Sequence, residues 1–164
     1  MRKTILVVVV ISIAVVAVWR SAQPGPSAAR PDRLLLDRIW IDHIPRTDKD
    51  TMQAFIAISE DTRGVFSASS QWRGSYELFR YEARGAELRI VYPQTGEREA
   101  VRATARRCAE RDMDFCLEIK GASRGVKNYY SRKGWEIEHA RDARTIEAQI
   151  ETLRAQLVAA EPTH

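Results

Sequence analysis

The sequence contains few of the residues and motifs that mark metalloproteins and the common enzyme classes. Its 164 residues include only 2 Cys and 3 His, and because the histidines are scattered along the chain we expect no metal site. No phosphate-binding loop or His-Glu-x-x-His occurs. His43, with turn carboxylates such as Asp48 and Asp50 nearby, is a candidate general base, but a structural role accounts for it better. We therefore predict a protein that is not an enzyme and has no cofactor.

A strong excess of charge of one sign is also missing. The formal net charge is +4, from 26 Lys and Arg against 22 Asp and Glu. Three of the basic residues, Arg2, Lys3 and Arg20, flank an N-terminal apolar run, so the rest of the chain is close to neutral. No zinc-finger, helix-turn-helix or single-strand-binding signature is present. We therefore expect no nucleic-acid partner.

One long hydrophobic run is present, at residues 5–19, and only Ser12 interrupts it. The basic residues before it and the Pro-, Ser- and Ala-rich linker at 21–32 are typical of an export segment. We favour a signal anchor within residues 1–20 that spans the membrane through residues 4–20, because snorkelling basic side chains and Trp19 compensate for its short apolar length. A cleaved signal peptide, with small residues at 27–29 as the cleavage region, is the alternative.

Both interpretations place the rest of the chain outside the cytoplasm, since the basic residues lie at the N-terminal end of the apolar run. With an anchor, the expected location is the inner membrane, single-pass, with the C-terminal domain in the periplasm. After cleavage, the protein would instead be periplasmic or secreted.

Short segments rich in β-branched and aromatic residues recur from Arg33 onward, separated by Gly, Asp and Pro. Apolar and polar side chains alternate in them, as at Leu88, Ile90 and Tyr92, which predicts antiparallel strands with one face in water. We expect an all-β domain over residues 33–138, an antiparallel up-and-down barrel of about eight strands, with a sandwich as the alternative. The expected strands are Leu36–Ile44, Met52–Ser59, Gly64–Ser70, Gly74–Ala83, Glu87–Tyr92, Arg98–Cys108, Phe115–Lys120 and Val126–Ser131, with Trp135–Ile137 as a possible last pairing.

A C-terminal α-helix is predicted within residues 139–164. Its apolar residues Ile146, Ile150, Leu153 and Leu157 recur at the spacing of one helical face. We expect this amphipathic helix to pack on the barrel. Pairing with a partner or with a second copy is the alternative.

The only two cysteines, Cys108 and Cys116, lie at the facing ends of two expected neighbouring strands. The alternation places both side chains on the polar, outer face of the sheet, as a cross-strand bond requires. An oxidising compartment would allow a disulfide between them. Two free thiols are the alternative.

The segment 121–135 is unusual because basic residues and aromatic rings are interleaved in it. Cations beside aromatic rings can hold an anionic or aromatic ligand or contact a headgroup layer. Aromatic rings that close the ends of a barrel, with solvated Lys and Arg outside, are the structural alternative. The candidate ligand-binding residues are Tyr76, Tyr92, Arg124, Lys127, Tyr129, Tyr130 and Trp135.

The export segment, a first strand with Asp37 three residues before Trp40, the hairpin-linked strands and the closing helix together resemble the lipocalin-type, or calycin, barrel, although the Gly-x-Trp of that family's first strand is absent. The run from Arg124 to Trp135 resembles one in uncharacterised envelope proteins of myxobacteria. The lipocalin resemblance implies a small apolar molecule bound inside the barrel.

Two functions follow from these expectations. The first is a membrane-anchored, extracytoplasmic barrel that binds a small apolar or amphipathic ligand in an interior cavity. The second is a structural or protein-interaction module of the cell envelope, whose barrel has a solid core and whose partner is an envelope protein. The expected lining of the cavity is Ile56, Ile58, Tyr76, Leu88, Ile90 and Phe115.

Overall fold

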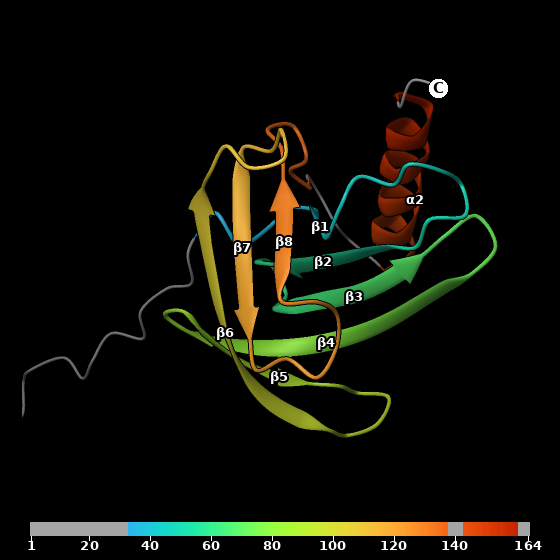
Figure 1. The fold of residues 1–164 in the computed structure, drawn as a ribbon. Helices are drawn as coiled ribbons and strands as arrows, with labels where there is room; N and C mark the ends of the chain where they lie inside the picture. Colours follow the sequence, from blue (N-terminus) through green and yellow to red (C-terminus); the bar gives the residue numbers. More distant parts are fainter. Residues whose placement is uncertain (1–32, 138–142, 161–164) are drawn as a thin grey trace, which may run out of the picture.

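The computed structural model describes residues 33–137 and 143–160, which form a closed antiparallel barrel of eight strands and one helix (Figure 1). Consecutive strands are neighbours around the barrel, and β8 returns to β1 through the pairing of Ile41 with Tyr130. The predicted up-and-down barrel is therefore confirmed, and the sandwich is excluded. The elements are β1 (Trp40–Ile41), β2 (Met52–Ile58), β3 (Arg63–Ser69), β4 (Gly74–Arg84), β5 (Glu87–Val91), β6 (Arg98–Arg107), β7 (Phe115–Lys120), β8 (Asn128–Ser131) and α2 (Ala143–Ala160).

The strand boundaries follow from the turn residues between them. Gly85, with φ of 63°, makes the tight turn between β4 and β5, and Gly121, with φ of 86°, ends β7. Glycine adopts this left-handed backbone region without the steric cost that other residues incur. Such an eight-stranded closed barrel is compatible with a lipocalin-like fold.

The first strand is shorter than the segment Leu36–Ile44 predicted for it. Asp37 has φ of 54°, and its carboxylate accepts hydrogen bonds from the Ser59 amide at 2.8 Å and the Ser59 hydroxyl at 2.5 Å. This bend breaks the extended conformation before β1. Arg38 instead makes an isolated antiparallel bridge with Glu136, so the predicted last pairing at Trp135–Ile137 is present as a single bridge.

The wall of β1, β2, β3 and β8, which we call the covered wall, is buried on both faces. Helix α2 packs on its outside through Ile146, Ile150, Leu153 and Leu157, so the predicted docking of this helix on the barrel is confirmed. Every residue of β2 except Gln53 is consequently buried. Side chains of the covered wall that meet the helix cluster include Ile41, Met52, Ile56, Val65 and Tyr130.

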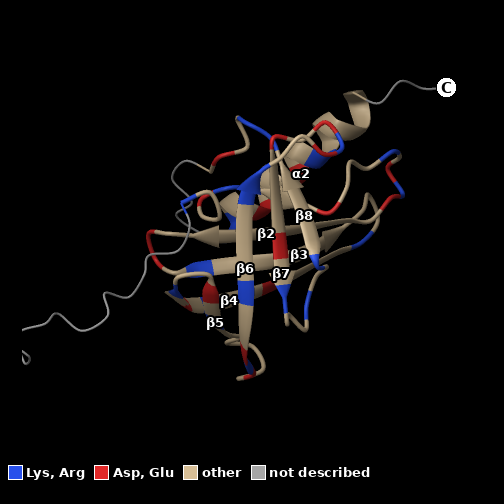
Figure 2. Cartoon of the chain, turned by 60° about the vertical axis from the view of Figure 1, so that its left-hand side comes forward, with Lys and Arg blue, Asp and Glu red and all other residues tan. Residues whose placement is uncertain are grey.

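The wall of β4, β5 and β6, which we call the open wall, meets α2 near the start of β4, where Tyr76 packs against the helix cluster. The rest of its outside has no helix among the described residues packed on it. Its burial alternates along β5, along most of β6 and along β4 from Leu78, as at Leu88, Arg89 and Ile90. Figure 2 shows Lys and Arg along β6. The alternation predicted from the sequence is thus correct for this wall.

Among the described residues, no helix has the length and apolar character needed to cross a membrane. The hydrophobic run at 5–19, on which the predicted anchor or signal peptide rests, lies outside the described residues.

Candidate functional site

The barrel interior is occupied by interlocking aromatic side chains. The ring of Phe79 lies 5.8 Å from that of Phe55, 5.2 Å from that of Phe66 and 6.4 Å from that of Tyr92, measured between centroids. Phe55 also lies 6.0 Å from Tyr129. These separations fall within the range of favourable ring contacts, so aromatic rings fill the place where a lipocalin-type ligand would lie.

One end of the barrel is closed by the segment that precedes β1. Leu35 is 1 % exposed and belongs to the interior cluster. The Trp40 indole nitrogen donates to the Leu35 carbonyl oxygen at 3.0 Å, which fixes this segment across the opening. The Tyr81 hydroxyl donates to the Ile58 carbonyl oxygen at 2.9 Å at the same end. Leu35 therefore acts as an apolar plug.

The opposite end is closed by the β7–β8 loop and its residue Arg124. The Arg124 guanidinium lies 4.1 Å from the centre of the Tyr92 ring, and its Nε donates to Glu77 at 3.0 Å. A second ion pair joins Arg124 to Glu97. The Glu99 carboxylate accepts from the Tyr92 hydroxyl and from the Ser123 amide. Salt bridges, a cation–π contact and hydrogen bonds thus hold the loop over this end.

The buried tyrosines at these ends favour their neutral forms. Burial raises the pKa of Tyr92 above its ordinary value, and the hydrogen bond to the Glu99 carboxylate adds to that effect. Burial raises the pKa of Tyr129 to about 12, although its oxygen accepts a hydrogen bond from the Val126 amide, which opposes the shift. The tyrosine hydroxyls at these positions therefore stay neutral and form hydrogen bonds at the edge of the core.

The six residues expected to line an interior cavity do not share one side of the wall. Leu88, Ile90 and Phe115 lie in the interior cluster, whereas Ile56, Ile58 and Tyr76 lie outside, in the cluster with α2. The difference on β2 arises because both of its faces are apolar, so alternation could not show which residues point inward.

A groove of about 810 Å³ lies outside the barrel, between α2 and the segment that follows β8. Trp135, Ile39 and Leu153 supply apolar surface there, while Glu136 and Gln149 supply polar groups. Pockets of roughly 300–1,000 Å³ that combine apolar walls with a few polar groups are typical of small-ligand sites. The remaining described lining is Lys133, Gly134, Arg144, Thr145, Ala148, Thr152 and Gln156.

Polar side chains also lie between α2 and the barrel. The Tyr76 hydroxyl donates to Glu151 at 2.7 Å, and the Arg154 guanidinium donates to the Asp48 carbonyl oxygen at 2.5 Å. Arg154 is 5 % exposed, and its Nε has no partner among the described residues. Arg154 fixes α2 against the β1–β2 loop, a role that the sequence did not indicate because a helical arginine is usually solvated.

The seven candidate ligand-binding residues are distributed over three places. Tyr92 and Arg124 meet at one end of the barrel, with Tyr129 in the adjoining core. Tyr76, Tyr130 and Trp135 belong to or pack against the cluster under α2. Lys127 is exposed and pairs with Glu118 at 3.2 Å. Glu77 and Glu99 belong to the same end of the barrel as Arg124. The sequence analysis did not single them out, because each looks like an ordinary polar residue within a strand.

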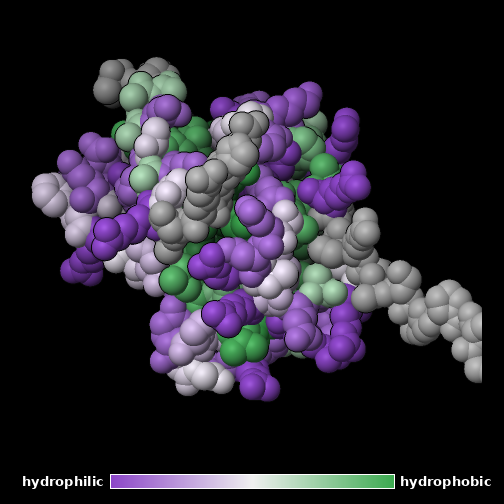
Figure 3. Space-filling model, turned by 180° about the vertical axis from the view of Figure 1, so that it is seen from behind, coloured by the Kyte–Doolittle hydropathy of each residue, from purple (hydrophilic) through white to green (hydrophobic). Residues whose placement is uncertain are grey.

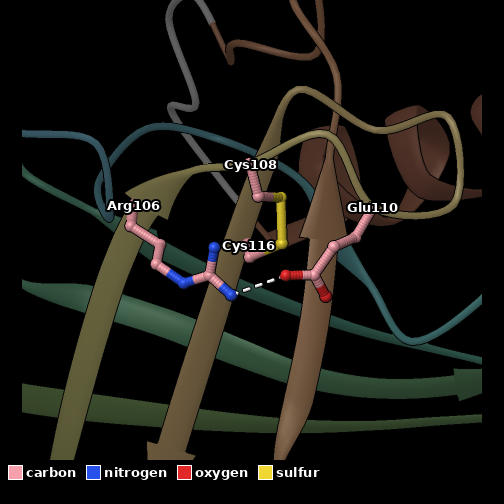
Figure 4. The surroundings of a disulfide bond; sticks show 4 residues. All are labelled: Arg106, Cys108, Glu110 and Cys116. Carbon is pink, nitrogen blue, oxygen red and sulfur yellow. Dashed lines mark hydrogen bonds and ion pairs between the residues drawn. A yellow bond between two sulfur atoms is a disulfide. The ribbon is translucent and has the colours of Figure 1, made fainter.

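The predicted disulfide between Cys108 and Cys116 is confirmed, with Cα atoms 5.8 Å apart. Figure 4 shows Arg106 and Glu110 beside the bond, joined by an ion pair at 2.6 Å. Cys116 is 7 % exposed, because this part of the outer face adjoins the cluster under α2. The expectation that the outer face of the sheet is exposed to solvent is therefore wrong at Cys116.

His43 lies in a loop that carboxylates organise. Its Nδ1 is 2.9 Å from Asp42, and its Nε2 is 3.7 Å from Asp50. The same Asp42 carboxylate accepts from the amides of His43 and Gln53, and Asp50 accepts from the Arg46 amide. These bonds describe a side-chain-capped turn. His139 and His164 lie outside the described residues.

A metal ion has no free set of ligands in the described part of the chain. The cluster with suitable spacing is Cys108, Glu110 and Cys116, and both of its sulfur atoms are consumed by the disulfide.

Comparison with known proteins gives no relative: no family model, no curated protein and no solved structure matches this chain.

Proposed function

We propose that this chain is a non-catalytic interaction module of the cell envelope, tethered to the inner membrane through residues 4–20, with its barrel on the periplasmic side. The observation that carries the proposal is the aromatic cluster around Phe79, which occupies the barrel interior. With the interior filled, binding must use the outer surface. In this proposal the barrel resembles a lipocalin in its strand order and its C-terminal helix but has no interior ligand pocket.

Three features support the proposed location. The basic residues before the apolar run favour an orientation with the barrel outside the cytoplasm. A disulfide between Cys108 and Cys116 is typical of an oxidising compartment. The linker at 21–32 separates the apolar run from Leu35, so the barrel can fold next to the membrane. A cleaved, periplasmic or secreted form is the alternative. Determining the N-terminal residue of the mature protein decides between the two.

The interior is tested by titrating a fluorescent fatty acid into the full chain in lipid nanodiscs. We expect no saturable binding to the wild type beyond that of empty nanodiscs. Phe79→Ala removes a ring that is 1 % exposed and is expected to create a cavity that admits an apolar probe. Saturable wild-type binding that an interior Ala103→Leu substitution blocks would overturn the solid-core proposal.

The interaction role is tested by placing a photo-crosslinking residue at Gln149, on α2, and a matched one at Thr104, on the open wall. We expect a defined adduct with one envelope protein from Gln149 in native membranes and none from Thr104. Equal adducts from both positions, or none from either in native membranes, would contradict the proposal.

A second candidate function is favoured by the groove beside α2. An amphipathic small molecule could place its apolar part on Trp135 and Leu153 and its polar part near Gln149. Lysophospholipid added to the nanodisc-held chain would then shift the emission of Trp135, and Trp135→Phe would remove the shift. An unchanged emission spectrum would reject this second function.

A further inference from the structure

The outer surface of the open wall carries a set of arginines that outnumber the two glutamates among them, Glu82 and Glu87. We call it the arginine face and define it as Arg80, Arg84, Arg89, Arg98 and Arg102. They share one face because the residues between them on β4, β5 and β6 point inward: Tyr81, Leu88, Ile90, Val101 and their neighbours are buried in the core.

The strand register brings these arginines close together. Arg80 is paired with Val91, and Val91 is paired with Arg98, so a half-buried valine lies between two guanidinium-bearing residues. Two rows further along β6, Arg102 lies directly opposite Lys120 on β7, whose amino group pairs with Glu118 at 3.1 Å. Like charges facing each other across strands destabilise a sheet slightly. An anionic surface bound to this face would relieve that repulsion.

Two glutamates lie among these arginines, and Glu87 is opposite both Arg84 and Arg102 in the strand register. Arg89 pairs with Glu87 at 3.0 Å, and Glu82 lies opposite Arg89 in the register. The other four arginines have no ion pair among the described residues. A shallow depression of about 830 Å³ lies on this wall, with Arg80, Arg89 and Arg98 in its lining together with Glu82, Glu87 and Glu99.

Exposed hydrophobic side chains lie along the same strand. In the described part of the chain, the large hydrophobic residues that are exposed are Trp72, at 73 %, and Leu78, at 38 %. Leu78 precedes Arg80 by two residues on β4 and therefore shares its face, and Trp72 lies at the tip of the β3–β4 hairpin. Figure 3, the view from behind, shows hydrophobic residues only in separate areas among hydrophilic ones. Tryptophan beside arginine is typical of a headgroup layer.

The entry of the N-terminal segment lies at the edge of the arginine face. Arg33 and Leu36 share a depression with Thr62, Tyr81 and Ala83. Thr62 and Tyr81 also line the depression that contains Arg80. The linker of residues 21–32 spans at most about 40 Å when extended. A membrane that holds residues 4–20 is therefore within reach of the arginine face.

We propose that the arginine face docks on the anionic phospholipid headgroups of the membrane in which residues 4–20 are embedded, so that the barrel lies on its open wall. On β4 the membrane-facing part would run from Leu78 to Arg84, because Tyr76 near the start of the strand donates to Glu151 of α2. Trp72 would then lie at the edge of the docked surface. This inference rests on the membrane tether of the proposed function.

The test uses the full chain in nanodiscs that contain lipid brominated near the headgroup. Emission of Trp72, obtained by subtracting the spectrum of Trp72→Phe, is compared in neutral phosphatidylcholine and in phosphatidylcholine with 30 % phosphatidylglycerol. We expect stronger quenching in the anionic nanodiscs and reversal in 0.5 M NaCl, because salt screens exposed charges. Arg80→Gln with Arg98→Gln should weaken docking about 30-fold, since each basic residue near an anionic surface contributes a factor of about five.

The matched control is Arg46→Gln with Lys49→Gln, which removes the same charge from the exposed β1–β2 loop. It should leave the quenching unchanged. Equal quenching of Trp72 in neutral and anionic nanodiscs, or equal losses in both double variants, would overturn the docking proposal while leaving the tether intact. Binding of heparin by the arginine face without lipid-dependent quenching would assign it to a soluble polyanion and likewise overturn docking.

Carbonate extraction of native membranes separates the two proposals. Release of the chain into the soluble fraction would overturn the tether. Retention of the chain, combined with absent quenching, would overturn only the role of the arginine face.

Discussion

The covered wall and the open wall of this barrel are made from the same kind of strand but bury their residues differently. In β2 nearly every side chain is buried, because the interior cluster lies on one face and α2 on the other. In β5 only the inward residues Leu88 and Ile90 are buried. The comparison shows that a single amphipathic helix converts half of a barrel into a two-layer core and leaves the other half as a one-layer wall open to solvent.

The largest expected effect comes from outward-facing residues of matched type on the two walls. Ile56→Ala, on the covered wall, removes a side chain that is fully buried under α2 and should lower the free energy of unfolding by about 3 kcal/mol. Val91→Ala, on the open wall, removes a half-buried side chain and should cost less than about 1 kcal/mol. Urea unfolding of the full chain in nanodiscs measures both. Equal costs would show that α2 does not protect the covered wall.

The next largest loss of stability is expected from removing the disulfide, which is attached to β7, the strand between the open wall and the covered wall. Replacing Cys108 and Cys116 by Ala opens the loop between β6 and β7 and should lower stability by about 2.5 kcal/mol, on the chain-entropy estimate for a loop of this size. Reduction of the wild type should give the same loss. Urea midpoints that are unchanged by both treatments would rule out a stabilising role for the bond.

Alkaline pH should weaken the interior shared by both walls. The pKa of Tyr129 is raised to about 12 by burial, so its neutral form stabilises the fold at neutral pH. That contribution is complete below the unfolded pKa near 10 and is lost as pH rises toward 12. At pH 11 the loss from Tyr129 alone should be about 1 kcal/mol. Tyr129→Phe should make the decline in unfolding free energy between pH 9 and pH 11 shallower, and an identical decline would refute the assignment.

The smallest effect is expected on the outside of the open wall. Glu87→Gln removes an exposed ion pair with Arg89 and should change stability by less than about 0.5 kcal/mol, since such pairs are screened by water. A loss of unfolding free energy above about 1 kcal/mol, measured by urea unfolding, would contradict this, because it would mean that the ion pair is shielded from water.

The two walls also explain how much of the fold could be predicted from the sequence. On the open wall, alternation at Leu88, Arg89 and Ile90 defined both the strand and the inward face. On β2, Phe55 and Ile56 are both apolar, so the strand was predictable but its inward face was not. The stripe from Ile146 to Leu157 showed that α2 packs on the barrel, and the apolar residues on both faces of β2 are the signal for the wall that receives it.

The ends of the barrel were harder to predict than its walls. The pairing of Cys108 with Cys116 follows from their positions on one hairpin. In contrast, the contact of Arg124 with Tyr92 joins residues more than thirty positions apart, and Leu35 precedes the first strand as an ordinary apolar residue. Long-range closure of this kind depends on how the barrel curves, which periodicity does not encode.

The solid interior is the claim on which the proposed function depends, and exposure of the full chain to xenon under pressure tests it most directly. Xenon occupies apolar cavities that are large enough to hold it. We expect no xenon inside the wild-type barrel and one bound atom at the vacated ring position in Phe79→Ala. Xenon bound among Phe55, Phe66 and Tyr92 in the wild type would contradict the account and restore an interior ligand site.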